Sequence, residues 1–595
     1  MEDTDLWKRH LLNLVSQVAL AGYVVGKQWR HLDKQLHTPM VLMFISGTIK
    51  YAERTCALYR VGSKSTPTSI SVVSKASASF GTNSPYYHAL FDTLPPMEEK
   101  DLAQLAIIRF GGILDIFMDV SSYNSGEREV SVIKEGLEKL QSSADRVYMA
   151  YKLAEIHLSL IYDYLYTKFG TRYVVRGEIV GCPMCNAIQR LVCFASTSAA
   201  LVLFVRRVDI TKYNGADVVV SYILLVGAIT LEVSAIFLGC ISSYWSEPSI
   251  TGAWHSFWYC CICCFTSIPW VSQCSDYISQ WVGGIIRTLI RRLHLLNRGE
   301  WSGNLAQYNL IGGGIQEKRA GRWEKMLRRI GIRGDTTVVA ASAELKKVVL
   351  DKLLGVLTTP RLKEWDLTRF HGQWAQWTLG EMQHEGSSMA AQRALEVSCI
   401  QDLDFVSNVI IWHYTTDLCF FTQDQEATGD NSSEQLRATC MELSNYILHL
   451  IAKHKLVGSC DVLYLVSRAQ EEVKWYLDSG GGSVDKYRLI LQMRGVSPGS
   501  GPGLDQAWSV HMELLKIDDA YDRWELITAV WVEMLVYLAH DSGASFHAKH
   551  LSMGGEFVTH VRMLLIILGL QCLTELKKRI SYEPPGEKSN SLAEG

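Results

Sequence analysis

The longest apolar run of the chain reads VVVSYILLVGAITLEVSAIFLGCISSYW, at Val218–Trp245, and Glu232 is its only charged residue. A membrane-spanning helix needs about 20 predominantly apolar residues, so this run can cross a bilayer with some tilt. A second run, LVCFASTSAALVLFV at Leu191–Val205, carries no charge and is followed directly by two arginines. The two runs predict lipid-embedded helices, and they place the main transmembrane region at residues 186–296.

Two other regions extend this prediction. The runs LLNLVSQVALAGYVV at Leu11–Val25 and VLMFISGTI after Pro39 predict N-terminal membrane helices within residues 1–60. The segment Trp254–Cys274 is rich in Trp and Tyr, which favour the membrane interface, so it either crosses the bilayer or lies among the headgroups. Its cysteine cluster at Cys260–Cys264 is a candidate for palmitoylation, with plain packing as the alternative.

The composition excludes several classes of protein. The chain has 595 residues, of which 48% are hydrophobic, and a formal net charge of -3. A chain so close to neutrality lacks the positive field that attracts nucleic acid, and no nucleic-acid partner is expected. Its 15 cysteines are unevenly spaced, unlike those of a secreted disulfide scaffold, which predicts a reducing compartment for the C-terminal part.

Basic residues gather after the last apolar run, most densely at Lys318–Arg333. Lys and Arg near membrane helices favour the cytosolic side, so the C-terminal tail is expected in the cytosol. The same stretch either contacts anionic lipid, at about 1 kcal/mol per basic residue, or forms a solvated charged face. Because Arg206 and Arg207 compete for the cytosolic side, the number and orientation of the spans stay open, as does the choice between plasma membrane and endomembrane.

The predicted fold is all-α, with multi-pass transmembrane helices followed by a large helical cytosolic domain. From about Gly334 onward the periodicity is helical with little strand pattern. Two strong helices are expected near Arg523–His540 and Glu556–Lys577, and the second is too short an apolar run to be another crossing. The predicted segments are N-terminal membrane helices 1–60, a flexible loop and linking helix 61–126, a helical hairpin 127–185, the transmembrane region 186–296, a cytosolic helical domain 297–495, a linker 496–522 and a C-terminal helical module 523–595.

Several long blocks of the sequence resemble a known family. They include EDTDLWKRHLLNLVSQVALAGYVV at Glu2–Val25, LIYDYLYTKF at Leu160–Phe169, IIWHYTTDLCFF at Ile410–Phe421 and the block at Arg523–Gln571. Together they are similar to the plant domain-of-unknown-function 4220 family, whose members commonly end in a domain-of-unknown-function 594 module. The resemblance implies a plant membrane protein and no particular chemistry. Family members carry about two or three further membrane-length helices before the first block, so these N-terminal helices are expected to be missing here.

Glu232 is the first candidate for a functional residue. An ionised carboxylate at mid-membrane costs at least a few kcal/mol, so it must face a partner or water. The functional reading is an ion or proton path, which would make the protein a channel or transporter. The structural reading, which we favour, is a pair with a basic residue of another helix, such as Lys50 or Arg54.

Histidines near the C-terminus form the second candidate group. His547 and His550 are three residues apart, which places both on one face of a helix. Imidazole and carboxylate groups can hold zinc or act as acid and base, which would suit an enzyme. The sequence has no HExxH or other recognised catalytic spacing, so we predict no metal or cofactor. The cluster comprises His540, Asp541, His547 and His550, with Glu556 and His560 nearby.

Trp412, His413 and Asp417 form the third candidate group. His413 and Asp417 are four residues apart and can bond to each other along one helix face. No nucleophile accompanies them, so we interpret them as a polar link inside a packed helix. The leading hypothesis is therefore a membrane-anchored protein that acts by binding a protein partner through its helical tail. The alternatives are a channel or transporter built on Glu232 and an enzyme built on the C-terminal histidines.

Overall fold

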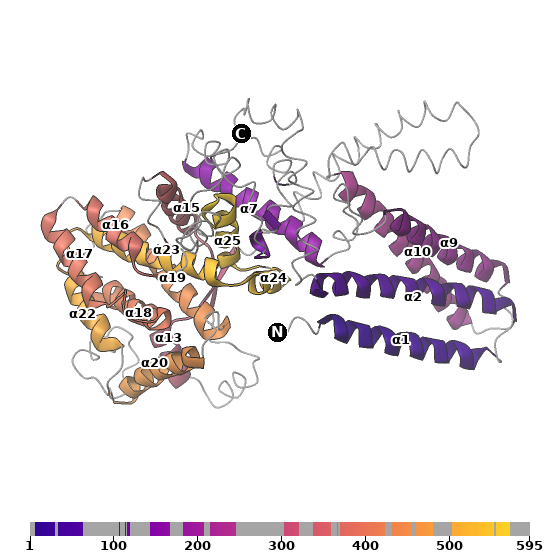
Figure 1. The fold of residues 1–595 in the computed structure, drawn as a ribbon. Helices are drawn as coiled ribbons and strands as arrows, with labels where there is room; N and C mark the ends of the chain where they lie inside the picture. Colours follow the sequence, from indigo (N-terminus) through magenta and orange to yellow (C-terminus); the bar gives the residue numbers. More distant parts are fainter. Residues whose placement is uncertain are drawn as a thin grey trace, which may run out of the picture. The chain divides into compact units, whose positions relative to one another are not determined.

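The computed structural model describes residues 6–29, 34–63, 106, 113–114, 116–119, 143–166, 183–207, 215–244, 303–319, 337–358, 366, 369–382, 384–422, 431–454, 460–479, 503–552 and 555–571. Within these ranges the chain forms sixteen helices and two short strands, which confirms the prediction of a mostly helical protein (Figure 1). The chain divides into two compact units. The first unit comprises Met1–His88, Gln104–Asp115 and Ser159–Glu300, and the second comprises Ala89–Ala103, Ile116–Leu158 and Trp301–Gly595.

The described part of the first unit is a set of four long helices. They are α1 (Leu6–Gln28), α2 (Lys34–Ser63), α9 (Pro183–Arg207) and α10 (Gly215–Tyr244). Helix α2 packs against α1 and α9, and α9 packs against α10 (Figure 1). These helices contain the apolar runs of the sequence, because a helix closes the backbone hydrogen bonds of such a run within one segment. Helix α2 begins before its apolar run and includes Pro39.

Helix α10 buries a single stripe of side chains one heptad apart, Val218, Leu225 and Glu232. Seven of its other described side chains are large, apolar and exposed, in contrast to the charged outer face of most surface helices. The exposed set is Val219, Val220, Ile223, Leu224, Val226, Leu231 and Val233. The outward face of this helix therefore has the composition of a protein interior.

Among the described helices, α10 alone meets both the length and the hydropathy of a membrane span. The segment Gly215–Ser234 has 20 residues and a mean hydropathy of 1.9, and 17% of its apolar window is buried. Two other apolar helical stretches, Val192–Arg206 and Phe557–Ile567, are shorter. Length and composition therefore make α10 a candidate membrane helix.

The second unit is built around two almost completely buried helices, α18 (Phe405–Thr422) and α23 (Ala520–Asp541). Every side chain from Val406 to Cys419 on α18 is buried. Helix α19 (Asn431–His454) packs against both of them, and the indole Nε1 of Trp531 on α23 donates a hydrogen bond of 2.9 Å to Thr416 Oγ1 on α18. A helix that is buried on all sides must lie in the centre of a large core.

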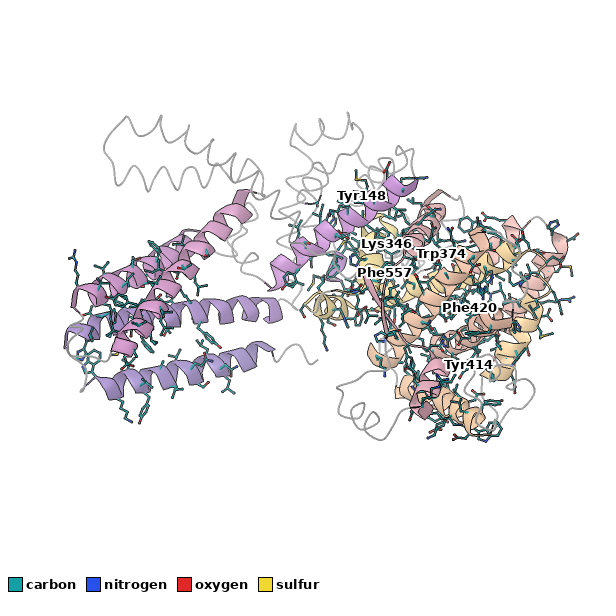
Figure 2. The ribbon with its side chains drawn as sticks, turned by 180° about the vertical axis from the view of Figure 1, so that it is seen from behind. Tyr148, Lys346, Trp374, Tyr414, Phe420 and Phe557 are labelled. Atoms are coloured by element: carbon teal, nitrogen blue, oxygen red, sulfur yellow. The ribbon has the colours of Figure 1, made fainter. Side chains whose placement is uncertain are left out.

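Shorter helices surround this centre. The predicted helix at Glu556–Lys577 is observed as α25 (Phe557–Ile567), whose side chains are all buried, so the prediction of a core helix is confirmed. The first part of α7 (Ser143–Tyr166) also packs here, with the Tyr151 ring stacked on Phe557 at a centroid distance of 6.3 Å. Figure 2 labels Phe557 and, on α7, Tyr148. The remaining helices are α13 (Leu310–Arg319), α15 (Ala343–Thr358), α16 (Gln373–Glu381), α17 (Glu385–Val397), α20 (Cys460–Ser479), α22 (Leu504–Leu514) and α24 (Ala544–Ser552).

A two-stranded antiparallel ribbon adds a feature that the all-α prediction lacked. Strand β1 (Asn304–Gln307) pairs with β2 (Thr337–Ala340), with Leu305 opposite Val339. Leu305 is buried where β1 contacts α19, whereas every residue of β2 is exposed. Strands of four residues show too few alternations to stand out in a sequence pattern.

Several predicted features lie outside the described residues. They include the interfacial segment Trp254–Cys274 with its cysteines Cys260–Cys264, and all of the basic stretch Lys318–Arg333 beyond Arg319. Lys318 itself donates a hydrogen bond to the Leu477 carbonyl near the C-terminal end of α20 and lies 3.6 Å from Asp478 Oδ1. Its charge therefore complements the negative end of the α20 dipole.

Candidate functional site

His413 and Asp417 lie in a buried polar cluster where α13 begins between α18 and α19. Nδ1 of His413 is 2.7 Å from Ser444 Oγ, and Nε2 accepts a hydrogen bond of 3.3 Å from the backbone N–H of Leu310. An acceptor role for Nε2 assigns the proton of the neutral imidazole to Nδ1, which donates to Ser444. The ring is thus held as a neutral link between three chain segments.

Asn309 joins this cluster to the start of α13. Its Nδ2 group donates to both carboxylate oxygens of Asp417, at 3.1 and 3.0 Å, and to Asn445 Oδ1 at 3.0 Å. Its Oδ1 accepts a hydrogen bond of 2.7 Å from the N–H of Gly312, which is the geometry of an N-cap. Trp412 is fully buried nearby in sequence, and its indole Nε1 finds no hydrogen-bond partner among the described residues. These contacts suit helix capping and core packing.

The C-terminal histidines are dispersed rather than convergent. Nδ1 of His547 is 3.0 Å from Thr559 Oγ1, and His550 packs against the Phe546 ring at a centroid distance of 4.2 Å. Burial, with a smaller effect of the nearby Arg562 charge, holds the pKa of His547 well below its usual value. Burial also lowers the pKa of His560, to about 4. His540 and Asp541 form the last turn of α23, and no group of three or more metal-binding side chains occurs among the described residues.

Arg562 is the most connected polar side chain of this region, and the sequence analysis did not single it out. Its side chain is completely buried. Nη1 donates to the carbonyl of Ser542 at 2.9 Å and to those of Ala539 and His540 at 3.4 Å. A guanidinium at these carbonyls satisfies groups that the C-terminal end of α23 leaves without helical partners.

The second amino group of Arg562 reaches a distant part of the chain. Nη2 donates to the Phe117 carbonyl at 3.2 Å and forms an ion pair with Asp119 Oδ1. The other Asp119 oxygen accepts a hydrogen bond of 2.8 Å from the N–H of Ala544, the first residue of α24. Asp119 therefore bridges a buried cation and a helix N-terminus.

A cysteine–histidine pair, Cys419 and His511, is formed by residues 92 positions apart, with Sγ 3.2 Å from Nδ1. Cysteine proteases use such pairs, but they need a thiolate of lowered pKa. Here burial raises the pKa of Cys419 to about 12, so the group is a neutral thiol inside the core. The pair is suited to packing and hydrogen bonding.

Glu533 of α23 caps the N-terminus of α16. Its carboxylate accepts hydrogen bonds from the N–H groups of His371 at 3.2 Å and Trp374 at 2.8 Å. Gly372 between them has a φ of 69°, and a β-carbon there would lie 2.8 Å from the Ile400 side chain, so glycine is required. Burial raises the pKa of Glu533 to about 7 although these N–H groups oppose the shift.

In the first unit, Glu232 lies beside Lys50, one of the two basic partners that the sequence suggested for it. Its Oε1 atom is 2.5 Å from Lys50 Nζ, in a contact that lacks the alignment of a hydrogen bond. The Glu232 side chain is 7% exposed and that of Lys50 is 35% exposed. Between α2 and α9, the hydroxyl groups of Ser46 and Thr197 are 3.2 Å apart and buried. Polar contacts thus join α2 to both α9 and α10.

Comparison with known families matches two parts of the chain. A family model described as "Domain of unknown function (DUF4220)" matches residues 1–312, and one described as "Protein of unknown function, DUF594" matches residues 516–570. No curated protein and no solved structure matches the chain. The first match holds the Lys50–Glu232 pair and Asp119, and the second holds Glu533, the C-terminal histidines and Arg562.

Proposed function

The chain belongs to the DUF4220 family and carries a C-terminal DUF594 domain, and from this premise we propose that it is a multi-pass membrane protein that acts by binding. In this proposal the helices α1, α2, α9 and α10 anchor the protein in a bilayer. The helical second unit lies in the cytosol and presents a surface to a protein partner. The basic stretch Lys318–Arg333 lies against anionic lipid.

One observation carries the membrane part of the proposal, namely the inverted polarity of the first unit. Large apolar side chains point outward from α10, as they do from α1 at Leu12, Val15 and Leu20. Exposed apolar area of this extent costs about 25 cal/mol per Å² in water, whereas lipid removes the cost. An apolar exterior around polar internal contacts is the pattern expected of a helix bundle in lipid.

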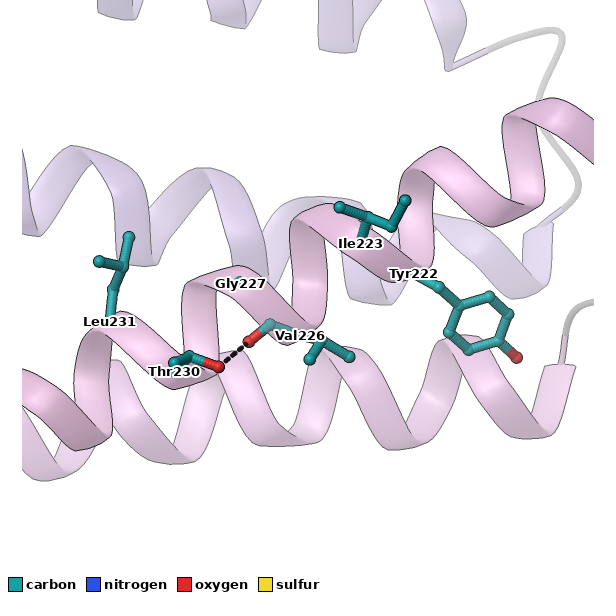
Figure 3. A pocket seen from close by; sticks show the side chains of 6 residues that line it. All are labelled: Tyr222, Ile223, Val226, Gly227, Thr230 and Leu231. Atoms are coloured by element: carbon teal, nitrogen blue, oxygen red, sulfur yellow. Dashed lines mark hydrogen bonds between the residues drawn. The ribbon is translucent and has the colours of Figure 1, made fainter.

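The surface of α10 illustrates this polarity. Figure 3 shows a hollow on one face of the helix, lined by Tyr222, Ile223, Val226, Gly227, Thr230 and Leu231. Two of these side chains carry a hydroxyl group, Tyr222 and Thr230, and that of Thr230 donates to the Val226 carbonyl at 2.9 Å. The face therefore offers no unsatisfied hydrogen-bonding group at that position, which suits contact with lipid chains.

The Lys50–Glu232 pair supports anchoring over conduction. A carboxylate in the hydrocarbon region is tolerated when a cation lies beside it, and Lys50 supplies that cation. A channel or transporter built on Glu232 needs the carboxylate to exchange this partner for a transported ion. We therefore keep conduction as the alternative and assign Glu232 a structural role.

Binding is favoured over catalysis by the way in which the second unit uses its polar groups. His413 and Asp417 hold the start of α13, Glu533 caps α16 and His547 bonds to Thr559. Catalytic acids and bases need a pKa matched to their task and access to a substrate. The lowered pKa values of His547 and His560 and their burial instead suit neutral core residues.

The decisive experiment places charges on the outward face of α10 in the full chain. Leu224→Lys and Leu231→Lys change residues that are 66% and 70% exposed. In lipid, each lysine costs about 2.5–3.5 kcal/mol near the middle of a span, so membrane insertion should fall sharply. In water, the same substitutions would be nearly neutral, within about 0.5 kcal/mol.

Insertion is measured as the share of protein that stays in the membrane pellet after alkaline carbonate extraction. The matched control is Tyr464→Lys on α20, a residue of the second unit that is 63% exposed. The control should stay in the pellet, as should the wild-type protein. Wild-type protein in the supernatant, or lysine variants that insert as well as the control, would contradict the proposal.

A further inference from the structure

A turn from the DUF4220 part of the chain is seated in the DUF594 domain. Residues Ile116–Asp119 form one turn closed by a hydrogen bond of 3.2 Å from the N–H of Asp119 to the Ile116 carbonyl. Asp119 has a φ of 56°, in the left-handed region that an aspartate adopts at a small cost. The contacts that hold this turn come from α24 and α25. Helix α25 in turn packs against α24 and α23 (Figure 1).

The turn is recognised through two side chains and one carbonyl. Phe117 is fully buried, with its ring 6.1 Å from that of His547 and 5.8 Å from the Arg562 guanidinium. The Phe117 carbonyl and the Asp119 carboxylate both accept from Nη2 of Arg562. An aromatic anchor beside a charge-assisted hydrogen bond is the usual form of a specific peptide contact.

The receiving side chains are also held by contacts that do not involve the turn. Nη1 of Arg562 is held by the three carbonyl groups at the end of α23, which orients the second amino group toward the turn. His547, which contacts Phe117, is fixed by Thr559 of α25. A guanidinium that is oriented in this way loses less freedom when it takes up a carboxylate.

From these contacts we infer that the DUF594 domain is a docking module whose ligand is the Phe117–Met118–Asp119 turn of the same chain. Occupation of the module also completes α24, because Asp119 Oδ2 accepts from the first N–H group of that helix. Release of the turn leaves this N–H group without its cap and removes the anion from the buried Arg562 charge. The stability of α24 in the DUF594 domain therefore depends on whether the turn from the DUF4220 part of the chain is bound.

The experiment compares hydrogen–deuterium exchange in full-length protein, purified in detergent. Phe117→Ala combined with Asp119→Asn should speed amide exchange in α24 by about five- to tenfold, as expected for a helix that loses its N-cap. Exchange in the buried helix α18 should stay unchanged. The matched control is Asp518→Asn, an exposed aspartate of the same unit, which should leave α24 as in the wild type.

A peptide added in trans tests recognition itself. A synthetic peptide of residues 114–122, LDIFMDVSS, should slow exchange in α24 of the double variant again, while the same peptide with both substitutions should not. A uniform rise of exchange that includes α18, an unchanged α24, or failure of the peptide to restore protection would overturn the inference. The contacts lie within the second unit, so each of these results leaves the membrane proposal intact.

Discussion

Lys50 Nζ lies 2.5 Å from Glu232 Oε1, so the only charged residue of the run Val218–Trp245 is paired across two helices that are distant in sequence. Glu232 lies on the same buried stripe of α10 as Val218 and Leu225. The pair therefore sets which face of α10 turns toward the other helices, and by exclusion which face turns outward. A polar contact of this kind can specify helix register in an apolar environment.

Removal of one member of this pair should destabilise the first unit more than removal of both. Lys50→Met leaves Glu232 as a buried charge without its cation, and Glu232→Gln leaves Lys50 without its anion. We expect a loss of about 1–3 kcal/mol for each single variant, reduced from the value for a fully buried pair because Lys50 is 35% exposed. The double variant should recover part of this loss, as measured by thermal unfolding of purified protein in detergent.

A coupling energy near zero in this double-mutant cycle would contradict a structural role for the pair. In that case Glu232→Gln should be tested for ion flux in reconstituted vesicles. A changed flux there would favour the channel alternative.

Glu533 predicts a pH dependence of stability. Its pKa is about 7 in the folded protein against 4.5 for the ordinary group, so the folded state binds the proton more tightly between these values. The contribution of Glu533 to stability is therefore fully present below about pH 4.5 and is lost as the pH rises to about 7, on the order of 3 kcal/mol in total. Glu533→Gln keeps an acceptor for the N–H group of Trp374 but cannot ionise.

The measurement compares thermal midpoints at pH 5 and pH 8 for wild type and Glu533→Gln. The wild-type protein should lose more stability than the variant on going to pH 8. Equal losses in the two proteins would show that Glu533 is not the titrating group.

Cys419 should be unreactive in the folded protein despite its histidine neighbour. Thiolate is the reactive form, and burial holds the pKa of Cys419 at about 12 and that of Cys440 also above its usual value. Maleimide should therefore label Cys399, which is partly exposed, before either of these residues. Mass spectrometry of partly labelled protein gives the order in which the cysteines react. Early labelling of Cys419 would contradict this prediction and support a role for Cys419 as a nucleophile.

Asn309 should tolerate removal of its amide better than conversion to a carboxylate. Asn309→Ala loses the cap of α13 and the bonds to Asp417, at about 1–3 kcal/mol. Asn309→Asp keeps the size of the side chain but sets a negative charge against the buried Asp417, so its loss should be larger by about 1 kcal/mol or more. Thermal unfolding checks this order, with Asn304→Asp at the exposed first residue of β1 as the control.

Helix positions were readily predicted because they depend on local pattern. The runs at Leu191–Val205 and Val218–Trp245 became α9 and α10, and the predicted helix at Arg523–His540 is α23. The helix at Glu556–Lys577 was also predicted to be a core helix, because His560 and Arg562 precede its apolar run and that run is short for a membrane span; the buried helix α25 (Phe557–Ile567) confirms this. The predicted domain boundaries at 495/496 and 522/523 remain predictions, although α23 shares its core with α18 and α19.

The partners of polar residues were predicted less completely. A buried charge indicates that a residue of opposite charge lies nearby, but the sequence does not show which residue that is. Lys50 and Arg54 were equal candidates for Glu232 by sequence. Asp119 and Arg562 are 443 positions apart, and neither carries a local motif that points to the other. The same holds for Cys419 and His511, which meet only because α18 and α22 pack together.

The amino-acid sequence by itself determined that this is a helical protein with an apolar stretch of membrane length, because hydrogen bonding within a helix and the transfer of apolar side chains are properties of single segments. Only the tertiary structure decided that Glu232 is paired with Lys50, that Glu533 caps α16 and that Arg562 receives the Phe117–Asp119 turn. Those pairings depend on which distant segments pack into the same core, and the local sequence pattern does not determine that packing.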